Sequence, residues 1–214
     1  MSSFYKNGSF YHVFNKSIAN YKIFANDENK QKFINTLCYY NSTKTKLSFS
    51  VFLRNQSNYQ ANILLPKIEG INKFLSYCIM PDHYHLLLKI ISDNKLSKYI
   101  GDVENSFSRY FNKKNNRKGP LWQSRFKAVL IDSDEQMLHV SRYIHLNPTT
   151  SGLVSNPQDW SFSSYNEIIS SNNVLKDYLV EISIRNPKKY QIFVENHKNY
   201  QRKLKLIRRL ILEN

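Results

Sequence analysis

The stretch KFLSYCIMPDHYHLLLKII, residues 73–91, predicts two β-strands joined by a tight turn. Apolar and aromatic residues dominate both halves, as is typical of buried strands. Between them stands Met80-Pro81-Asp82, in which proline restricts φ and the aspartate side chain can bond its own backbone, so this tripeptide favours a turn. The sequence therefore predicts a β-hairpin at residues 73–91.

The segments on either side of this hairpin complete an α+β pattern. Further strands are predicted at residues 9–18, 46–54 and 121–131, and a short one at 61–65. Helices are predicted at 26–41, capped by Asn26 or Asp27, at 95–116, and at 134–148, where Asn147-Pro148 stops the helix. This order favours a ferredoxin-like sandwich, in which helices pack on a central antiparallel sheet.

The chain of 214 residues suggests one main domain followed by a tail. We expect a domain over residues 1–170 and a basic, helical C-terminal extension over residues 171–214. Two interpretations of that extension remain open. It packs on the domain through an apolar face, or it is an arm that contacts DNA or a partner. The apolar face would consist of Ile192, Phe193, Leu204, Ile207 and Leu210.

Positive charge is the strongest compositional signal. The chain carries 31 Lys and Arg against 16 Asp and Glu, a formal net charge of +15. Such an excess on a folded domain indicates a polyanionic partner, nucleic acid first, and the 15 tyrosines offer rings for base stacking. The first residues lack a signal-peptide pattern and no apolar run is long enough to span a membrane, so we expect a cytoplasmic protein without a membrane partner.

The two histidines of the hairpin, His83 and His85, are candidate metal ligands. Residues two apart on a strand point to the same face, so both imidazoles project together just after the turn. Two imidazoles at this spacing can bind one divalent ion, and Cys38 and Cys78 add no structural zinc pattern. His12 is expected to pack in the core with Phe10 and Phe14.

A metal on a basic protein suggests phosphodiester chemistry, which requires a nucleophile. The helix at 95–116 presents one apolar stripe, and Tyr110 lies on it, with Tyr99 as its rival. If this stripe packs on the sheet face that carries His83 and His85, the Tyr110 phenol arrives beside the metal. Otherwise Tyr110 is a core residue, and a metal-activated water is the remaining nucleophile.

Several motifs in order resemble the IS200-like tyrosine transposases, in particular those associated with repetitive extragenic palindromes, within the HUH single-strand endonucleases. The resemblance covers roughly residues 9–170. It rests on YHVFNKS (11–17), CIMPDHYHLLL (78–88), RYFNKKNNRKGPLWQSRFKAVLI (109–131), RYIHLNPTTSGLV (142–154) and WSFSSYNEI (160–168). In RYIHLNP, His145 is expected to be a buried histidine with satisfied hydrogen bonds.

The resemblance implies a mechanism, a cofactor and a partner. Single-stranded or hairpin DNA lies on the basic surface, and Mg²⁺ or Mn²⁺ on His83 and His85 polarises the scissile phosphate. A tyrosine, here matched to Tyr110, attacks and forms a 5′-phosphotyrosine link, which a free 3′ hydroxyl reverses. The chain is expected to be a monomer or a homodimer. Candidate DNA-contacting residues are Arg109, Lys113, Lys114, Arg117, Lys118, Arg125 and Lys127.

One position departs from the family pattern. In family members a polar side chain one helical turn after the tyrosine commonly completes the metal site, whereas here that position is Lys114, a poor ligand. Asn115 and Glu104 are the candidate third ligands. The departure also keeps open an alternative function, a non-catalytic module that binds hairpin DNA or RNA and retains the fold.

Overall fold

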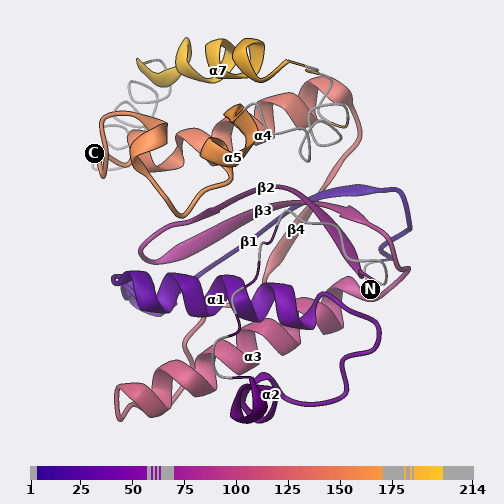
Figure 1. The fold of residues 1–214 in the computed structure, drawn as a ribbon, viewed down its shortest axis with the longest axis vertical. Coiled ribbons are helices and arrows are strands. Elements are labelled where there is room, and N and C mark those ends of the chain that lie inside the picture. The colour runs from indigo at the N-terminus through magenta and orange to yellow at the C-terminus, as the bar shows by residue number, and fades with distance from the viewer. Residues whose placement is uncertain are drawn as a thin grey trace. The chain divides into compact units, whose positions relative to one another are not determined.

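The computed structural model describes residues 4–56, 70–170 and 186–199, together with residues 59, 61, 63, 181 and 184. Its four strands are β1 (Phe10–Lys16), β2 (Asn72–Ile79), β3 (His83–Ile90) and β4 (Lys127–Ile131). The helices in Figure 1 are α1 (Asp27–Tyr40), α2 (Phe49–Asn55), α3 (Leu96–Lys114), α4 (Asp134–Thr150), α5 (Tyr165–Ile169) and α7 (Pro187–Glu195). Two short 3₁₀ helices are η1 (Ile18–Asn20) and η2 (Pro157–Asp159).

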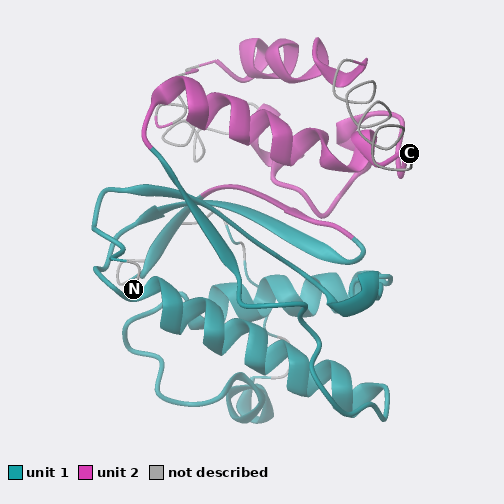
Figure 2. Cartoon of the chain, turned by 180° about the vertical axis from the view of Figure 1, so that it is seen from behind, with its two compact units in different colours: residues 1–74, 81–131 teal, residues 75–80, 132–214 magenta. Residues whose placement is uncertain are grey.

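The chain forms two compact units, which Figure 2 distinguishes by colour. The first unit comprises residues 1–74 and 81–131, and the second comprises residues 75–80 and 132–214. The first unit holds β1, β3, β4 and helices α1, α2 and α3, and the second holds α4, α5 and α7. The expected domain boundary at residue 170 stays a prediction.

The strands form one sheet with the order β2-β3-β1-β4, and β1 pairs antiparallel with both β3 and β4. This order, together with the succession β1-α1-β2-β3-α3-β4, is the ferredoxin-like arrangement, so the predicted α+β class is confirmed. The hairpin predicted from residues 73–91 is present as β2 and β3. The segment expected to form a short strand at 61–65 lies largely outside the described residues.

The register of β1 against β3 defines two faces of the sheet. Phe14 lies opposite His85, and Asn15 lies opposite Tyr84. Directly opposed residues share a face and successive residues alternate. One face, here called the histidine face, therefore carries His12, Phe14, His83 and His85. The other, here called the helix face, carries Val13, Asn15, Tyr84 and Leu86.

Helices α1 and α3 pack on the helix face. The Tyr84 ring lies 5.0 Å from that of Phe33 in α1, and the Phe33 ring lies 5.3 Å from that of Phe107 in α3. The stripe predicted for α3 supplies this core, and its members Leu96, Tyr99, Ile100, Val103, Phe107 and Phe111 are buried. Helix α1 begins as expected, because the Asn26 side chain accepts a hydrogen bond from the Asn29 amide at 2.8 Å.

The strand predicted at 46–54 is wrong, because this segment forms helix α2. Its apolar residues alternate, but Phe49 and Phe52, three apart, also share one helical face. Both rings pack on Tyr39 of α1, with centroid separations of 4.9 and 4.7 Å. The alternating residue Leu47 is exposed. Ser48 caps the helix by accepting from the Val51 amide.

Two predicted boundaries also need correction. The strand expected at 121–131 is shorter, since β4 begins at Lys127. Helix α4 does not stop at Asn147-Pro148 but continues to Thr150. A proline near the end of a helix removes only one backbone hydrogen bond, and the Ser151 amide closes the last turn by donating to the Asn147 carbonyl at 2.9 Å.

The second unit is organised around His145 of α4, which is completely buried. Its Nδ1 lies 2.6 Å from the Tyr190 hydroxyl of α7, and its Nε2 lies 2.8 Å from the Ser164 hydroxyl. Burial lowers the pKa of His145 to about 3, so the imidazole is neutral and its expected satisfied state is confirmed. Helix α7 thus packs through Tyr190 and Val194, whereas Ile192 is exposed. Leu204, Ile207 and Leu210 lie outside the described residues.

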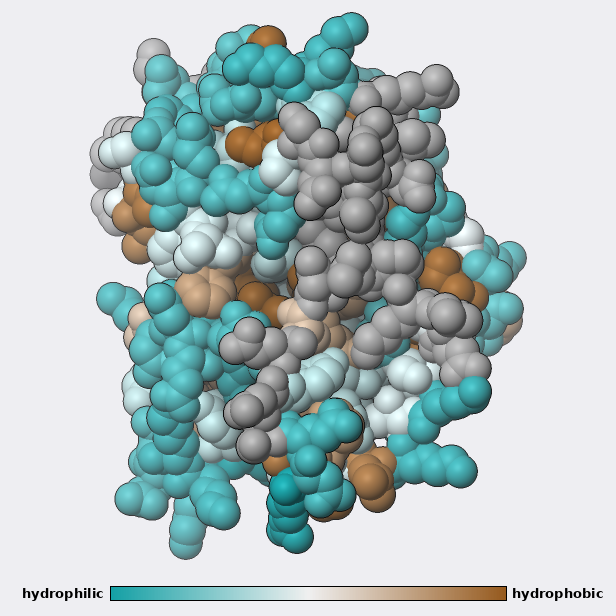
Figure 3. All heavy atoms as spheres, viewed as in Figure 1, coloured by the Kyte–Doolittle hydropathy of each residue, from teal (hydrophilic) through white to brown (hydrophobic). Residues whose placement is uncertain are grey.

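Hydrophilic residues predominate on the face of the molecule drawn in Figure 3, and the hydrophobic ones are scattered. Cys38 and Cys78 are both buried, and neither forms a disulfide. Within the described ranges, none of the helices combines the length and the apolar character that crossing a bilayer requires.

Candidate active site

His83 stands at the start of β3 and is held by the turn that precedes it. Its Nδ1 lies 2.6 Å from Oδ1 of Asp82, and both side chains are about one-fifth exposed. Partial burial alone would raise the pKa of Asp82, but the hydrogen bond and the charge of His83, together with nearby Lys16, lower it. Asp82 is therefore a carboxylate that fixes the orientation of the His83 ring.

His85 follows on the same face and is 6% exposed. Its Nδ1 lies 3.0 Å from Nε2 of His12 on the neighbouring strand β1. The rings of His83 and His85 are 5.0 Å apart and nearly perpendicular. Burial lowers the pKa of His85 well below its ordinary value and that of His12 to about 4. Both imidazoles are therefore neutral near pH 7, as a metal ligand must be.

His12 was expected to serve core packing. It does stack on Phe14 and His85, with centroid separations of 4.9 and 5.1 Å. It also forms the hydrogen bond to His85, which the strand pattern of β1 alone did not indicate. The sequence shows His12 two residues before Phe14, on the same face of β1. The register of β1 against β3 is needed to show that this face also carries His85.

His83 and His85 are suited to bind a divalent metal, but they supply two of the ligands that it needs. Each histidine has its Nδ1 held by a second group, Asp82 or His12, which is the arrangement that orients ligating imidazoles in metalloproteins. However, no group of three or more His, Cys, Asp or Glu side chains positioned to hold a metal occurs among the described residues. A metal here would have two protein nitrogen ligands, and water or phosphate oxygens would have to complete its coordination.

Lysines accompany the histidines on this face. Lys16 lies opposite His83 across the β1–β3 ladder, and its Nζ is 3.6 Å from Asp82. Lys127 lies opposite Phe14 across the β1–β4 ladder, which places it on the histidine face as well. Cations at both sides of the histidine pair suit a phosphodiester substrate.

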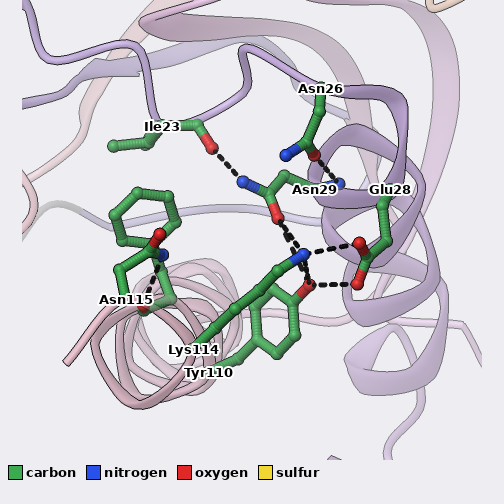
Figure 4. Close-up of polar contacts among 8 residues, drawn as sticks. Ile23, Asn26, Glu28, Asn29, Tyr110, Lys114 and Asn115 are labelled. Atoms are coloured by element: carbon green, nitrogen blue, oxygen red, sulfur yellow. Dashed lines mark hydrogen bonds and ion pairs between the residues drawn. The ribbon is translucent and has the colours of Figure 1, made fainter.

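The structure does not meet the condition under which the Tyr110 phenol would arrive beside the histidine pair. Helix α3 packs on the helix face, so its stripe lies on the side of the sheet opposite His83 and His85. Figure 4 shows the Tyr110 hydroxyl pointing to α1, where it lies 3.0 Å from Glu28 Oε1 and 3.2 Å from Asn29 Oδ1. Burial raises the pKa of Tyr110, an effect that the nearby Lys114 ammonium opposes. The rival Tyr99 is a core residue that donates to the Leu37 carbonyl.

Neither candidate third ligand joins the histidines. Glu104 is buried on the helix face, where its Oε1 accepts from Asn15 Nδ2 at 2.7 Å and from the Tyr84 hydroxyl at 2.8 Å. Asn115 donates to the Phe111 carbonyl at the end of α3. Lys114 forms an ion pair with Glu28, also on the helix side (Figure 4). The departure at Lys114 therefore has no bearing on the histidine pair.

The predicted DNA-contacting residues fall into four groups. Lys127 belongs to the histidine face, and Arg109, Lys113 and Lys114 line a pocket beside α3. Arg117 donates to the carbonyls of Gly119 and Pro120 and so supports the loop after α3. Lys118 and Arg125 are exposed in the segment between α3 and β4. Their contacts with DNA remain predictions.

Replacing Glu104 with Gln should change how stability depends on pH. Burial raises the pKa of Glu104 from 4.5 to about 7, although the Asn15 and Tyr84 hydrogen bonds oppose the rise. Below pH 4.5 the folded and unfolded states are both protonated. Between pH 4.5 and 7, Glu104 ionises in the unfolded state while it is still protonated in the folded state. The wild type therefore loses about 2–3 kcal/mol of unfolding free energy over this range, and the Gln variant does not.

Urea unfolding at pH 4.5 and pH 8 measures this difference. Glu135→Gln, at a carboxylate that is 86% exposed on α4, is the matched control and should show no such pH-dependent change. A Glu104→Gln effect that is equal at both pH values would contradict the raised pKa.

Part of this chain is similar to a known class of proteins. Residues 50–147 match the family model described as "Transposase IS200 like". This matched region, 98 of the chain's 214 residues, is similar to the IS200-like transposases.

Among relatives, the chain is similar to a "Putative REP-associated tyrosine transposase" of Haemophilus influenzae, 28% identical over 114 residues, which are 49% of this chain and 65% of the relative. It is also similar to the "REP-associated tyrosine transposase" of Escherichia coli, 25% identical over 96 residues, 44% of this chain and 55% of the relative. The chain thus matches about 65% and 55% of the length of these two relatives.

A solved structure supports the fold. It is described as "Structure of the REP associates tyrosine transposase bound to a REP hairpin", and it superposes with a TM-score of 0.57 at 16% identity. The superposition covers 80% of this chain and 85% of that one. At this identity the likeness shows the fold alone.

Proposed function

We propose that this protein is a metal-dependent tyrosine transposase that cleaves and rejoins single-stranded DNA beside a hairpin. The observation that carries the proposal is the pair of imidazoles, His83 and His85, each held through Nδ1 and flanked by lysines on one face of the sheet. The family match over residues 50–147 supports it. The REP hairpin bound by the solved relative suggests the same class of DNA partner.

In this proposal, Mg²⁺ or Mn²⁺ held by His83 and His85 would supply electrophilic activation of the scissile phosphate. Asp82 and His12 keep the two rings oriented and fix which nitrogen remains available for the metal. Lys16 and Lys127 attract the phosphate backbone to this face. The attacking phenol forms a P–O bond as the 3′ oxygen departs with its electron pair, so the phosphotyrosine retains the energy for rejoining.

The nucleophile is better assigned to Tyr143 of α4 than to Tyr110. A tyrosine that attacks DNA must be accessible, and of the tyrosines in the matched region Tyr143 is 42% exposed, whereas Tyr77, Tyr84 and Tyr99 are buried. One helical turn after Tyr143 stands Asn147, whereas one turn after Tyr110 stands Lys114. Asn147 is the polar residue type that the family resemblance implies at that position.

A covalent-adduct assay tests the proposal. Labelled single-stranded DNA containing a hairpin is incubated with the full chain and Mn²⁺ or Mg²⁺, then separated on a denaturing gel. We expect a protein–DNA species in which label on the DNA 3′ of the cleavage position stays with the protein, and EDTA should prevent its formation. Cleavage without any adduct would indicate a water nucleophile instead and would sink the transposase assignment.

The non-catalytic alternative loses the observation that supported it. Lys114 kept that alternative open because a cation stood where a metal ligand was expected, yet Lys114 pairs with Glu28 on the helix side of the sheet. Tight hairpin binding with neither adduct nor cleavage, in the presence of metal, would restore the alternative.

A further inference from the structure

A second candidate site lies on the helix side of the first unit, apart from the histidine face. A pocket of about 600 Å³ opens between α1, the start of α2 and the C-terminal half of α3. It belongs entirely to the first unit, and the sheet separates it from His83 and His85. None of the catalytic residues proposed above lines it, so its lining residues have no part in the proposed chemistry.

Positive charge is the first property of this pocket. Five cationic side chains line it and no acidic side chain does: Lys32, Arg54, Arg109, Lys113 and Lys114. Glu28 neutralises Lys114 from the neighbouring turn of α1. Arg109 and Lys113, one turn apart on α3, are exposed. Such a concentration of cations in a concave site selects an anion.

Aromatic walls are its second property. The ammonium of Lys32 lies 4.4 Å from the centre of the Phe49 ring and 5.3 Å from that of the Tyr110 ring. Phe49 is almost fully buried, whereas Tyr110 is half-buried and offers part of its ring to the cavity. The Tyr110 hydroxyl is tied to Glu28 and Asn29, which holds the ring in place without requiring a ligand.

We propose that this pocket binds one unpaired nucleotide of the DNA strand, with its base against the Tyr110 ring and its phosphate on Arg109 and Lys113. The combination of an immobilised aromatic ring with a cationic rim is the way proteins hold single-stranded nucleic acid without reading a duplex. The cavity volume admits a single nucleotide. The inference rests on the proposed function for its DNA partner, but it concerns a contact on the other side of the sheet from the proposed chemistry.

Two hairpin probes test the site by fluorescence anisotropy, one blunt and one with a short unpaired tail, with 5′ and 3′ tails tried separately. We expect the wild type to prefer the tailed probe by about 10-fold. Tyr110→Leu should abolish that preference and Tyr110→Phe, which keeps the ring, should retain it. Arg109→Gln with Lys113→Gln should lower the salt dependence for the tailed probe by roughly 1–1.5 logarithmic slope units.

Lys98→Gln is the matched control, because Lys98 lies on the same helix, pairs with Asp102 and does not line the pocket. It should leave the preference for the tailed probe intact. Retention of that preference in Tyr110→Leu would overturn the assignment. If Tyr110→Leu folds poorly, the wild type can be tested instead by photo-cross-linking it to a probe whose tail contains 5-iodouracil. Cross-links to pocket peptides support the site and cross-links elsewhere reject it.

The outcomes separate this inference from the proposed function. If the wild type forms the covalent adduct but binds the blunt and tailed probes equally well, only the pocket proposal is overturned. Failure of the wild type to bind either probe overturns the transposase proposal and the pocket together.

Discussion

His83→Ala and His85→Ala should each reduce metal-dependent DNA cleavage by about 10³-fold, the largest effect expected in this chain. Electrophilic activation by a bound metal contributes several kcal/mol to the stabilisation of charge in phosphoryl transfer, and each 1.36 kcal/mol is a factor of ten in rate. His83 and His85 are the two candidate imidazole ligands among the described residues, so removal of either leaves one imidazole for the metal. Single-turnover rates across a Mn²⁺ titration measure the loss.

His139→Ala provides the control, since His139 is a half-exposed histidine on α4. It should cleave at the wild-type rate. Direct Mn²⁺ binding, followed by electron paramagnetic resonance, adds a readout that does not depend on activity. Unchanged Mn²⁺ affinity in both His83→Ala and His85→Ala would show that the metal binds elsewhere.

Tyr143→Phe should eliminate the covalent protein–DNA adduct, whereas Tyr110→Phe should leave it in place. The phenol oxygen is the atom that bonds to phosphorus, so its removal leaves no route to the link. Tyr110 is held by hydrogen bonds to Glu28 and Asn29 on the helix side, and Tyr143 is exposed on α4. Denaturing gels of the two variants with the same labelled hairpin compare them directly.

Peptide mapping of the wild-type adduct gives an independent answer. After digestion, the nucleotide-modified peptide should contain Tyr143. Tyr21 is 49% exposed but lies outside the matched region 50–147, so modification of Tyr21 would indicate non-specific attachment. An adduct on Tyr110 would refute the reassignment and would require that α3 presents its phenol to a phosphate away from the histidine face.

The sequence by itself determined the sheet and the pairing of the two histidines on it. The turn at Pro81-Asp82 is local chemistry, and the period of two places His83 and His85 on one face whatever else the chain does. The α3 stripe and the Asn26 cap are local in the same sense, because side-chain spacing along one helix decides them. The net charge of +15 likewise follows from composition.

Only the tertiary structure decided which face of the sheet each helix covers. A stripe such as that of α3 shows that a helix has a buried side, but both faces of this sheet offer apolar residues, and the spacing cannot choose between them. Because α3 packs on the helix face, Tyr110 and Glu104 lie on the side of the sheet opposite the histidines. The same holds for residues 46–54, where packing of Phe49 and Phe52 on Tyr39 selected a helix over a strand. His12 met His85 because the β1–β3 register, a long-range property, placed them side by side.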